Sequence, residues 1–179
     1  NNEYESNYYE VVHEEFIVDP SISFPRNKPL YFNTGITFKN FDVKQSDTID
    51  YISRSLTTSP VNLLGVSGGV TYDKRDHPTA PFNGYFFSFQ GTYYPGIIDK
   101  VYDFGKVSGD LRGYLGYKQN ISLGLRIWGE KVIGDFPFFE SAFLGGSRLL
   151  RGFAGERFAG DGALLGSAEL RLKLFNMNI

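Results

Sequence analysis

The chain contains no cysteine, two histidines, one methionine and one tryptophan among its 179 residues. The missing thiols exclude disulfides and cysteine metal sites, and they fit a compartment in which thiols are avoided. No apolar run reaches about 18 residues, so no transmembrane helix is expected. Lysine and arginine total 18 against 20 acidic residues, which gives a net charge of -2. This balance excludes the basic footprint of a nucleic-acid-binding protein.

Aromatic residues and glycine, in contrast, are abundant. Aromatics make up 17% of the chain and glycine occupies 21 positions, whereas hydrophobic residues reach only 41%. The chain is therefore too polar for a helical membrane protein and too aromatic for a disordered one. Its length indicates one domain.

Apolar and polar residues alternate strictly over long stretches. Between Phe104 and Lys118 the odd positions are glycine, aliphatic or tyrosine, while the even positions include Lys106, Asp110 and Arg112. This period of two is that of a β-strand with one apolar face. The alternation predicts strands at 14–24, 30–41, 62–73, 82–94, 104–118, 121–133 and 162–175. The odd positions of 105–117 and the even positions of 164–174 are expected to face lipid.

Strand length and aromatic placement favour a membrane barrel. About ten residues tilted by about 40° span roughly 26 Å, the height of the apolar band of an outer-membrane barrel. Apolar-face aromatics gather at both strand ends, as membrane interfaces select. They are Phe24, Tyr72, Tyr85 and Tyr117 at one end, and Phe16, Phe38 and Tyr93 at the other. We predict an all-β, antiparallel transmembrane β-barrel with short connections on one side and long ones on the other; a soluble β-sandwich is the alternative.

A short connection fixes the register of two predicted strands. If Lys118-Gln119-Asn120 is a three-residue hairpin loop, Tyr117 pairs with Ile121 and Arg112 lies opposite Arg126. Like charges facing each other are unfavourable unless a neighbour compensates them. Asp110 lies diagonal to Arg126 and is the expected compensating charge.

Two stretches resemble a known family. "YDKRDHPTAPFNG" (72–84) has an aromatic-Asp-x-Arg-like turn, a proline and then a glycine before the next strand. "GGSRLLRGF" (145–153) is followed by the strand "LLGSAELRLKLF" (164–175). Together they resemble the BamA-like superfamily of outer-membrane insertases and translocases. The resemblance implies a barrel of sixteen strands preceded by periplasmic domains. This chain then supplies about seven strands over 1–179, with an inward-folding loop at 134–160 and no periplasmic domain.

The resemblance also implies site residues. The loop arginine, glycine and aromatic fall on Arg151, Gly152 and Phe153, and the acidic partner on the next strand falls on Glu169. Arg151 is expected to bind Glu169 inside the lumen, where a guanidinium can hold a carboxylate through two hydrogen bonds. The turn motif falls on Asp73, Arg75, Asp76, Pro81 and Gly84.

Other motifs indicate no chemistry. Gly65-Val66-Ser67-Gly68-Gly69 matches a hydrolase nucleophile elbow, but a strand continues through it and no helix follows. His13 and His77 have no acidic residues at a spacing that makes a convincing metal site. The glycine-rich stretch 145–162 lacks the Gly-Lys-Ser/Thr of a phosphate loop. No catalytic, cofactor-binding or metal residue is predicted, and the chain is not expected to be an enzyme.

Three functions remain open. The first is a barrel in the outer membrane of a Gram-negative bacterium, or of a derived organelle, that inserts or translocates polypeptides. The second is a simple pore whose selectivity is set by lumen charges. These are Lys106, Asp110, Arg112, Arg126 and Glu130. The third is a membrane anchor for a patatin-like hydrolase outside this chain. The expected partners are outer-membrane lipid, the remaining barrel strands from the same or another chain, and an unfolded polypeptide.

Overall fold

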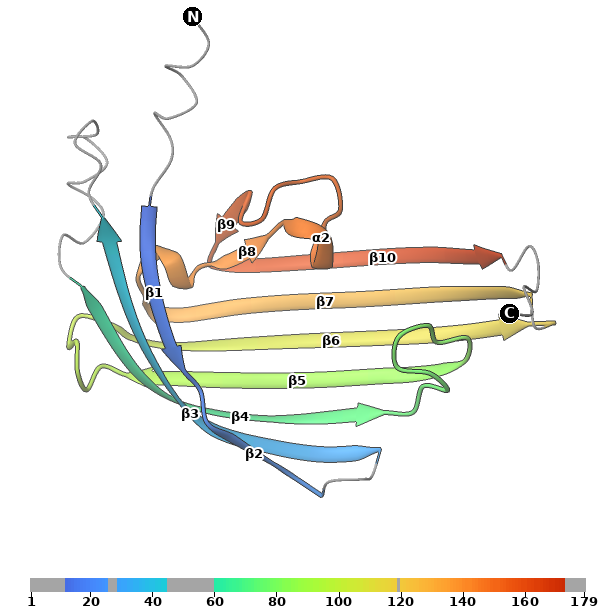
Figure 1. The fold of residues 1–179 in the computed structure, drawn as a ribbon, viewed down its shortest axis with the longest axis horizontal. Helices are drawn as coiled ribbons and strands as arrows, with labels where there is room; N and C mark the ends of the chain where they lie inside the picture. The colour runs from blue at the N-terminus through green and yellow to red at the C-terminus, as the bar shows by residue number, and fades with distance from the viewer. Residues whose placement is uncertain (1–11, 26–28, 45–59, 119, 173–179) are drawn as a thin grey trace, which may run out of the picture.

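The computed structural model describes residues 12–25, 29–44, 60–118 and 120–172. These residues form an antiparallel sheet that curves strongly about its long axis (Figure 1). Its strands are β1 (Val12–Val18), β2 (Ser21–Phe24), β3 (Leu30–Lys44), β4 (Val61–Asp73), β5 (Gly84–Pro95), β6 (Asp103–Tyr117), β7 (Ile121–Asp135) and β10 (Gly162–Leu172). The strand order is β1-β3-β4-β5-β6-β7-β10, with β2 also paired to β3. From β3 onward, each strand of this sheet therefore pairs with the next strand of the sheet along the chain, as in a barrel wall.

Every predicted strand range contains a strand of this sheet, but the first range holds two. The ladder breaks at Asp19 and Pro20, because proline has no N–H to donate. The Pro20 carbonyl accepts a hydrogen bond from Ile36 N (3.2 Å), and Asp19 accepts one from Thr37 Oγ1 (3.0 Å). Both halves of the strand thus remain attached to β3. At the other end, residues 173–175 of the last predicted strand lie outside the described residues.

The hairpin between β6 and β7 has the predicted register. Tyr117 pairs with Ile121, and Arg112 lies opposite Arg126. Lys118 adopts a positive φ of 48°, which allows the tight connection. Gln119 itself lies outside the described residues. The register confirms that strict alternation and a short turn were enough to align these two strands.

The convex face of the sheet is apolar and exposed. Leu115, Leu164 and Leu170 are exposed to 68%, 75% and 63%. The predicted lipid-facing positions of β6 and β10 share this face, except Leu174, which lies outside the described residues. A β-sandwich would bury Leu170 against a second sheet, so that alternative is contradicted for the described part of the chain. Monomeric soluble proteins rarely expose so continuous an apolar surface.

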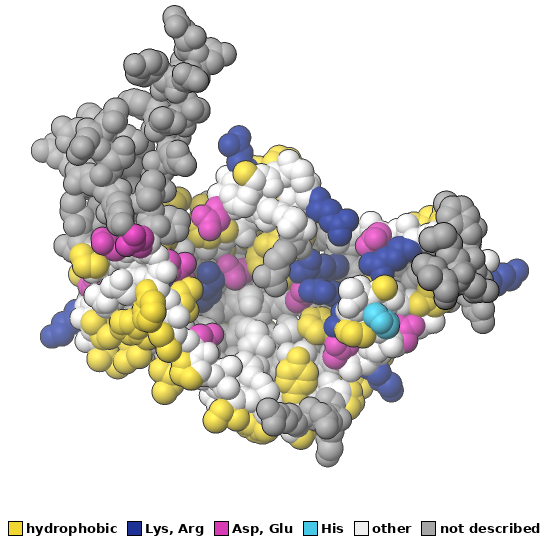
Figure 2. All heavy atoms as spheres, in the orientation of Figure 1, with side chains coloured by type: hydrophobic (Ala, Val, Ile, Leu, Met, Phe, Trp, Pro, Cys, Tyr) yellow, Lys and Arg dark blue, Asp and Glu magenta, His cyan; other side chains and the backbone are white. Residues whose placement is uncertain are grey.

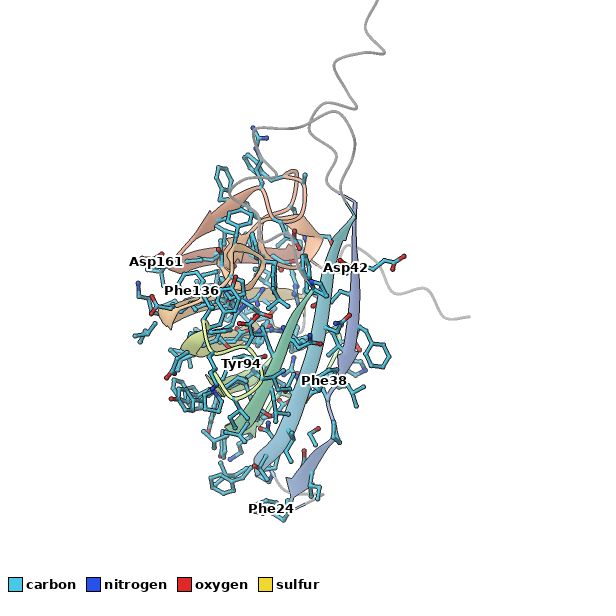
Figure 3. All side chains as sticks on the ribbon, turned by 90° about the vertical axis from the view of Figure 1, so that its left-hand side faces the viewer. Phe24, Phe38, Asp42, Tyr94, Phe136 and Asp161 are labelled. Atoms are coloured by element: carbon cyan, nitrogen blue, oxygen red, sulfur yellow. The ribbon has the colours of Figure 1, made fainter. Side chains whose placement is uncertain are left out.

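The core lies on the concave face, toward the long connections. Its buried residues are Val61, Leu63, Tyr94, Phe104, Val132 and Ala142. Figure 3 shows Tyr94 and Phe136 within the curve of the sheet, while Phe24 and Phe38 lie on its outer side. Ala142 comes from the connection between β7 and β10, so this connection folds inward at its start.

That connection has structure of its own. It contains the 3-10 helix η2 (Phe138–Glu140), the hairpin of β8 (Ala142–Leu144) and β9 (Phe158–Gly160), and the short helix α2 (Gly146–Leu149). The hairpin lies beside β10 at the edge of the sheet (Figure 1). The sequence analysis expected an inward-folding loop at 134–160 but none of these elements, because none is long enough to show a period.

Candidate functional site

The concave face gathers the charged side chains of several strands. By their register, Lys106, Asp110 and Arg112 on β6 and Arg126 and Glu130 on β7 all project from this face. Figure 2 looks onto it and shows basic and acidic side chains around a hollowed centre. All the predicted lumen charges therefore share one surface.

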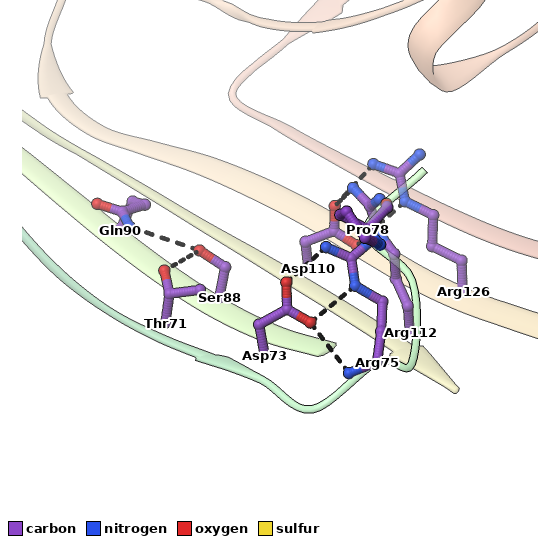
Figure 4. A network of polar contacts seen from close by, with 9 residues as sticks. All are labelled: Thr71, Asp73, Arg75, Pro78, Ser88, Gln90, Asp110, Arg112 and Arg126. Carbon is purple, nitrogen blue, oxygen red and sulfur yellow. Dashed lines mark hydrogen bonds and ion pairs between the residues drawn. The ribbon is translucent and has the colours of Figure 1, made fainter. Parts of the chain in front are cut away.

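The Asp110 cluster, made of Asp110, Arg112 and Arg126, lies on this surface, and Figure 4 shows its contacts from close by. Arg112 donates to Asp110 from Nε (3.0 Å) and Nη2 (2.5 Å). Arg126 donates to the same carboxylate from Nε (3.1 Å) and Nη2 (2.8 Å). The predicted compensation of the two facing arginines by Asp110 is thus found. The Asp110 side chain is only 14% exposed, so the carboxylate is shielded by the cations it binds.

The same pairing recurs wherever an acid precedes an arginine by two positions on a strand or at its end. Side chains two residues apart share one face of a strand, so the pair meets without a loop. In each case the arginine donates through Nε and Nη2 to both carboxylate oxygens. The pairs are Asp73 with Arg75 (2.8 and 2.6 Å), Asp110 with Arg112, and Glu169 with Arg171 (3.1 and 3.0 Å).

Phe86 links two of these pairs. The Arg75 guanidinium carbon lies 4.7 Å from the Phe86 ring centroid, and that of Arg112 lies 5.0 Å from it. Both distances are within the range of cation–π attraction. Phe86 projects from β5 into the concave face, where the alternation alone would place a polar residue. It joins the turn after β4 to the Asp110 cluster.

The turn between β4 and β5 folds back over this face. Phe82 and Asn83 reach β6 and β7: Ser122 Oγ donates to the Phe82 carbonyl (2.9 Å), and Gly116 N donates to Asn83 Oδ1 (2.8 Å). Arg171 Nη1 on β10 donates to the Pro81 carbonyl (3.1 Å). A Cβ on Gly116 would lie 2.0 Å from the Phe82 ring, so this glycine makes room for the turn. The 74–83 turn therefore covers one end of the concave face.

The predicted turn residues close the turn on itself. Arg75 binds Asp73 and donates from Nη1 to the Pro78 carbonyl (2.9 Å). Asp76 accepts the backbone N–H groups of Phe82 (2.9 Å) and Asn83 (3.0 Å). Gly84 has φ +113°, and a Cβ there would lie 2.2 Å from the Lys74 carbonyl oxygen. These motif residues thus have a structural task in the turn.

Asp76 makes the turn sensitive to acid. Desolvation raises the pKa of the Asp76 carboxyl. Backbone hydrogen bonds from Phe82 and Asn83 outweigh this effect and hold that pKa below the ordinary aspartate value. Because the folded-state pKa is depressed, the stabilisation is complete above about pH 3.9 and is lost as the pH falls through the lower folded-state pKa. We expect hydrogen exchange at the Phe82 and Asn83 amides, corrected for intrinsic rates, to accelerate in that window.

The control for this pH dependence is Asp76→Asn. The uncharged amide introduced at position 76 offers only one acceptor oxygen. The Phe82 and Asn83 amides should therefore be less protected from hydrogen exchange at neutral pH, and their protection should not change with acidification. The amides of Phe87 and Phe89, in the middle of β5, should keep their protection in both proteins. An identical pH profile in both proteins at Phe82 and Asn83 would contradict the role of Asp76.

The other end of the concave face is held by the Glu140 cluster: Lys39, Lys106, Glu130 and Glu140. Glu140 Oε1 accepts from Lys39 Nζ on β3 (2.5 Å), and Glu140 Oε2 lies 3.7 Å from Lys106 Nζ on β6. Lys106 also lies 3.3 Å from Glu130 on β7. The Glu140 side chain is only 3% exposed. Beside it, the rings of Phe139 and Phe41 stack with centroids 3.7 Å apart. The start of the 134–160 connection is thus fixed across the sheet to β3.

The Arg151-Gly152-Phe153 tip lies farther out in this connection. Gly152 has φ +91°, and the Phe153 ring packs against Phe158 (5.6 Å between centroids). Glu169 is bound by Arg171; among the described ion pairs, none joins it to Arg151. Arg151 is exposed but near enough to act electrostatically on the Glu169 carboxylate. The bond between Arg151 and Glu169 therefore stays a prediction.

Several residues of this face escaped the sequence analysis: Lys39, Phe82, Phe86, Glu140 and Arg171. Arg171 had a usable signal, the acid two positions before it. Glu140 also had one, because it is the single charge in "FPFFESAF" (136–143). When such an apolar segment is buried, its single carboxylate needs a cationic partner, because an unpaired buried charge is costly. Phe82 and Phe86 gave no signal that distinguishes them from other aromatics.

Within the described ranges, no group of three or more histidine or acidic side chains is placed to hold a metal ion. No helix among the described residues has the length and hydrophobicity to cross a membrane. Gly65 to Gly69 lie inside β4, so the predicted strand continues through the apparent nucleophile elbow. His77 Nδ1 accepts the Thr79 and Ala80 backbone N–H groups at 3.2 and 3.1 Å, which is a turn-capping role.

Comparison with known structures agrees with this architecture. The crystal structure of BamA from Haemophilus ducreyi lacking POTRA domains 1–3 superimposes with a TM-score of 0.64 at 16% sequence identity. The match covers 82% of this chain and 31% of that one, so this chain spans about a third of its length. No curated protein sequence matches the chain. At this identity the likeness establishes the fold alone.

Comparison with family models covers nearly the whole chain. The model of the Omp85 superfamily domain matches residues 1–178. The match includes both motifs on which the resemblance to BamA-like proteins was based, and it confirms that resemblance. The curved antiparallel sheet, apolar on its convex face and charged on its concave face, is the part of such a barrel that this chain forms. The chain belongs to the Omp85 superfamily.

Proposed function

We propose that this chain is part of an outer-membrane β-barrel that inserts polypeptides into the outer membrane or translocates them across it. Its membrane is that of a Gram-negative bacterium or a derived organelle. The observation that carries the proposal is the division of the sheet into an exposed apolar convex face and a charged concave face. Residues 1–179 then form about seven of an expected sixteen strands, and the same or another chain supplies the remainder.

The covered ends of the concave face favour this function over a simple pore. A pore needs an open path lined by charges that passing ions can reach. Here Asp110, Arg112, Lys106 and Glu130 are engaged in ion pairs with one another or with neighbouring side chains. The 74–83 turn and the segment containing Glu140 lie over the two ends of the same surface. Such a barrel wall suits gated handling of a polypeptide.

We further propose that Arg151 joins Arg171 on Glu169 in the complete barrel and thereby sets the position of the loop tip. Glu169 is half exposed, so its carboxylate has lone pairs available for a second guanidinium. No residue of this chain is assigned a catalytic, cofactor or metal role.

The test uses the full-length protein in lipid vesicles and measures assisted insertion of an unfolded outer-membrane protein. Arg151→Ala should reduce assisted insertion by about tenfold, as expected for a lost charge-assisted contact, while its own membrane insertion is unchanged. Arg157→Ala, an exposed arginine of the same connection, is the matched control. A double-mutant cycle with Glu169→Gln should show that the two losses are not additive. Exchanging the two charges is less informative, because an arginine at 169 would face Arg171.

Other results would favour other functions. Steady ion conductance without assisted insertion would establish a pore. Lipid or ester hydrolysis by the intact protein, with no effect of Arg151→Ala, would indicate an anchor for a hydrolase domain. Additive losses in the double-mutant cycle would contradict the contact between Arg151 and Glu169 while leaving the barrel function intact.

A further inference from the structure

The convex face carries a depression where two glycines meet. Gly109 on β6 pairs directly with Gly129 on β7. Phe89 pairs with Gly109 on one side, and Leu164 pairs with Gly129 on the other. The resulting shallow hollow has a volume of about 290 Å3. Its lining includes Phe89, Val107, Gly109, Gly129, Lys131 and Leu164.

Neither glycine is required by the local backbone. Both lie in regular strands with no positive φ, unlike Gly84. A Cβ on Gly109 would have its nearest neighbour 3.9 Å away, and one on Gly129 would lie 3.3 Å from the end of the exposed Leu164 side chain. Larger residues would therefore fit at both positions. What the glycines provide is the hollow itself, bordered by an aromatic and an aliphatic side chain.

A lysine stands at one end of the hollow. Lys131 follows Gly129 by two positions on β7, so it projects from the same face and toward the long connections. It pairs with Gly162, the first residue of β10, which places it where that strand gives way to the loop. Its Nζ lies 4.0 Å from Asp161, but both side chains are more than half exposed, so this pair is weak. Lysines at strand ends commonly extend to the membrane interface.

We propose that this hollow binds a phosphate-bearing membrane lipid, with one acyl chain over Gly109 and Gly129 and the phosphate at Lys131. The proposal rests on the proposed membrane location of the convex face. The apolar lining suits a hydrocarbon chain that lies against the barrel, and the hollow gives that chain more contact than the flat wall beside it. Lys131 supplies the charge complementarity, since a cation at the interface attracts an anionic headgroup.

The experiment measures lipid retained by the full-length protein after extraction from vesicles of phosphatidylglycerol and phosphatidylcholine, by native mass spectrometry. Gly109→Val and Gly129→Val should each lower retained phosphatidylglycerol by at least about tenfold, because the hollow is filled. Lys131→Gln leaves the hollow intact and should lower the preference for phosphatidylglycerol over phosphatidylcholine about fivefold.

The matched control is Gly113→Val. Gly113 lies on the same strand and face, and a Cβ there would meet nothing within 4 Å. This variant should retain lipid like the unchanged protein. Equal retention in all variants, or equal loss in the control, would overturn the proposal. A dimer that the Gly109 and Gly129 variants abolish would also overturn it, by identifying the hollow as a protein contact. Membrane insertion is measured separately, and failure of the unchanged protein to insert would refute the membrane barrel instead.

Discussion

Replacing Glu140 with glutamine is expected to destabilise the folded barrel by about 2–4 kcal/mol and to release the start of the 134–160 connection from the concave face. The carboxylate is almost fully buried between Lys39 and Lys106, so its loss leaves two ammonium groups with less compensation in a shielded place. Lumen water keeps the cost below that of a dry interior. The measurements are urea unfolding of the full-length protein in lipid vesicles and protease cleavage between residues 136 and 144.

Two controls separate this effect from a general loss of charge in the loop. Glu156→Gln changes an exposed glutamate of the same connection and should leave stability and cleavage unchanged. The double variant Lys39→Met with Glu140→Leu removes both main partners and should recover most of the loss, because an apolar pair of similar size can replace a buried ion pair. If Glu140→Gln behaves like Glu156→Gln, the buried pairing does not hold the connection in place.

Replacing Asp110 with alanine is expected to cost a similar amount, about 2–4 kcal/mol. The change leaves Arg112 and Arg126 directly opposite each other on neighbouring strands, where paired side chains are about 5 Å apart. Their repulsion should weaken the β6–β7 pairing and raise hydrogen exchange along it. The measurement is the unfolding midpoint in urea together with exchange of the amides from 108 to 128.

The rescue variant adds Arg126→Gln to Asp110→Ala. With one cation removed, the repulsion disappears and stability should return to within about 1 kcal/mol of the parent. Because Arg112 also lies near Phe86, the remaining cation keeps a favourable contact. Equal stability of the single and double variants would show that the two arginines do not repel each other in the folded barrel.

The sheet was predictable from the sequence because the residue pattern that specifies each strand and its pairing lies within short stretches of the chain. Strict alternation assigns each side chain to a face, and a three-residue connection leaves one register for β6 and β7. The position of Asp110 between two arginines follows from that register alone. The break at Asp19 and Pro20 was missed because the alternation continues across it, although the proline was a visible signal.

The closures at the two ends of the concave face were not predictable in this way. They depend on where long connections go in space. The predicted strand 82–94 included Phe82, but β5 begins at Gly84, so Phe82 belongs to the turn, and Glu140 lies in no strand. The choice of partner for Glu169 was likewise not predictable from local sequence. Glu169 is bound by Arg171, two positions away on the same face, whereas a contact with Arg151 would require the long connection to become ordered. Family resemblance pointed to the distant partner, and geometry favours the near one.

The order in which the wall assembles follows from these separations. Each neighbouring strand pair closes only a short or moderate stretch of chain, so hairpins can add to one another in sequence. The contact of Lys39 with Glu140 joins residues 101 positions apart, and that of Arg171 with Pro81 joins residues 90 apart. Because such closures lose more chain entropy, we expect them to form after the hairpins. If these long-range contacts form last, removing them should mainly speed unfolding and should change the rate of folding little.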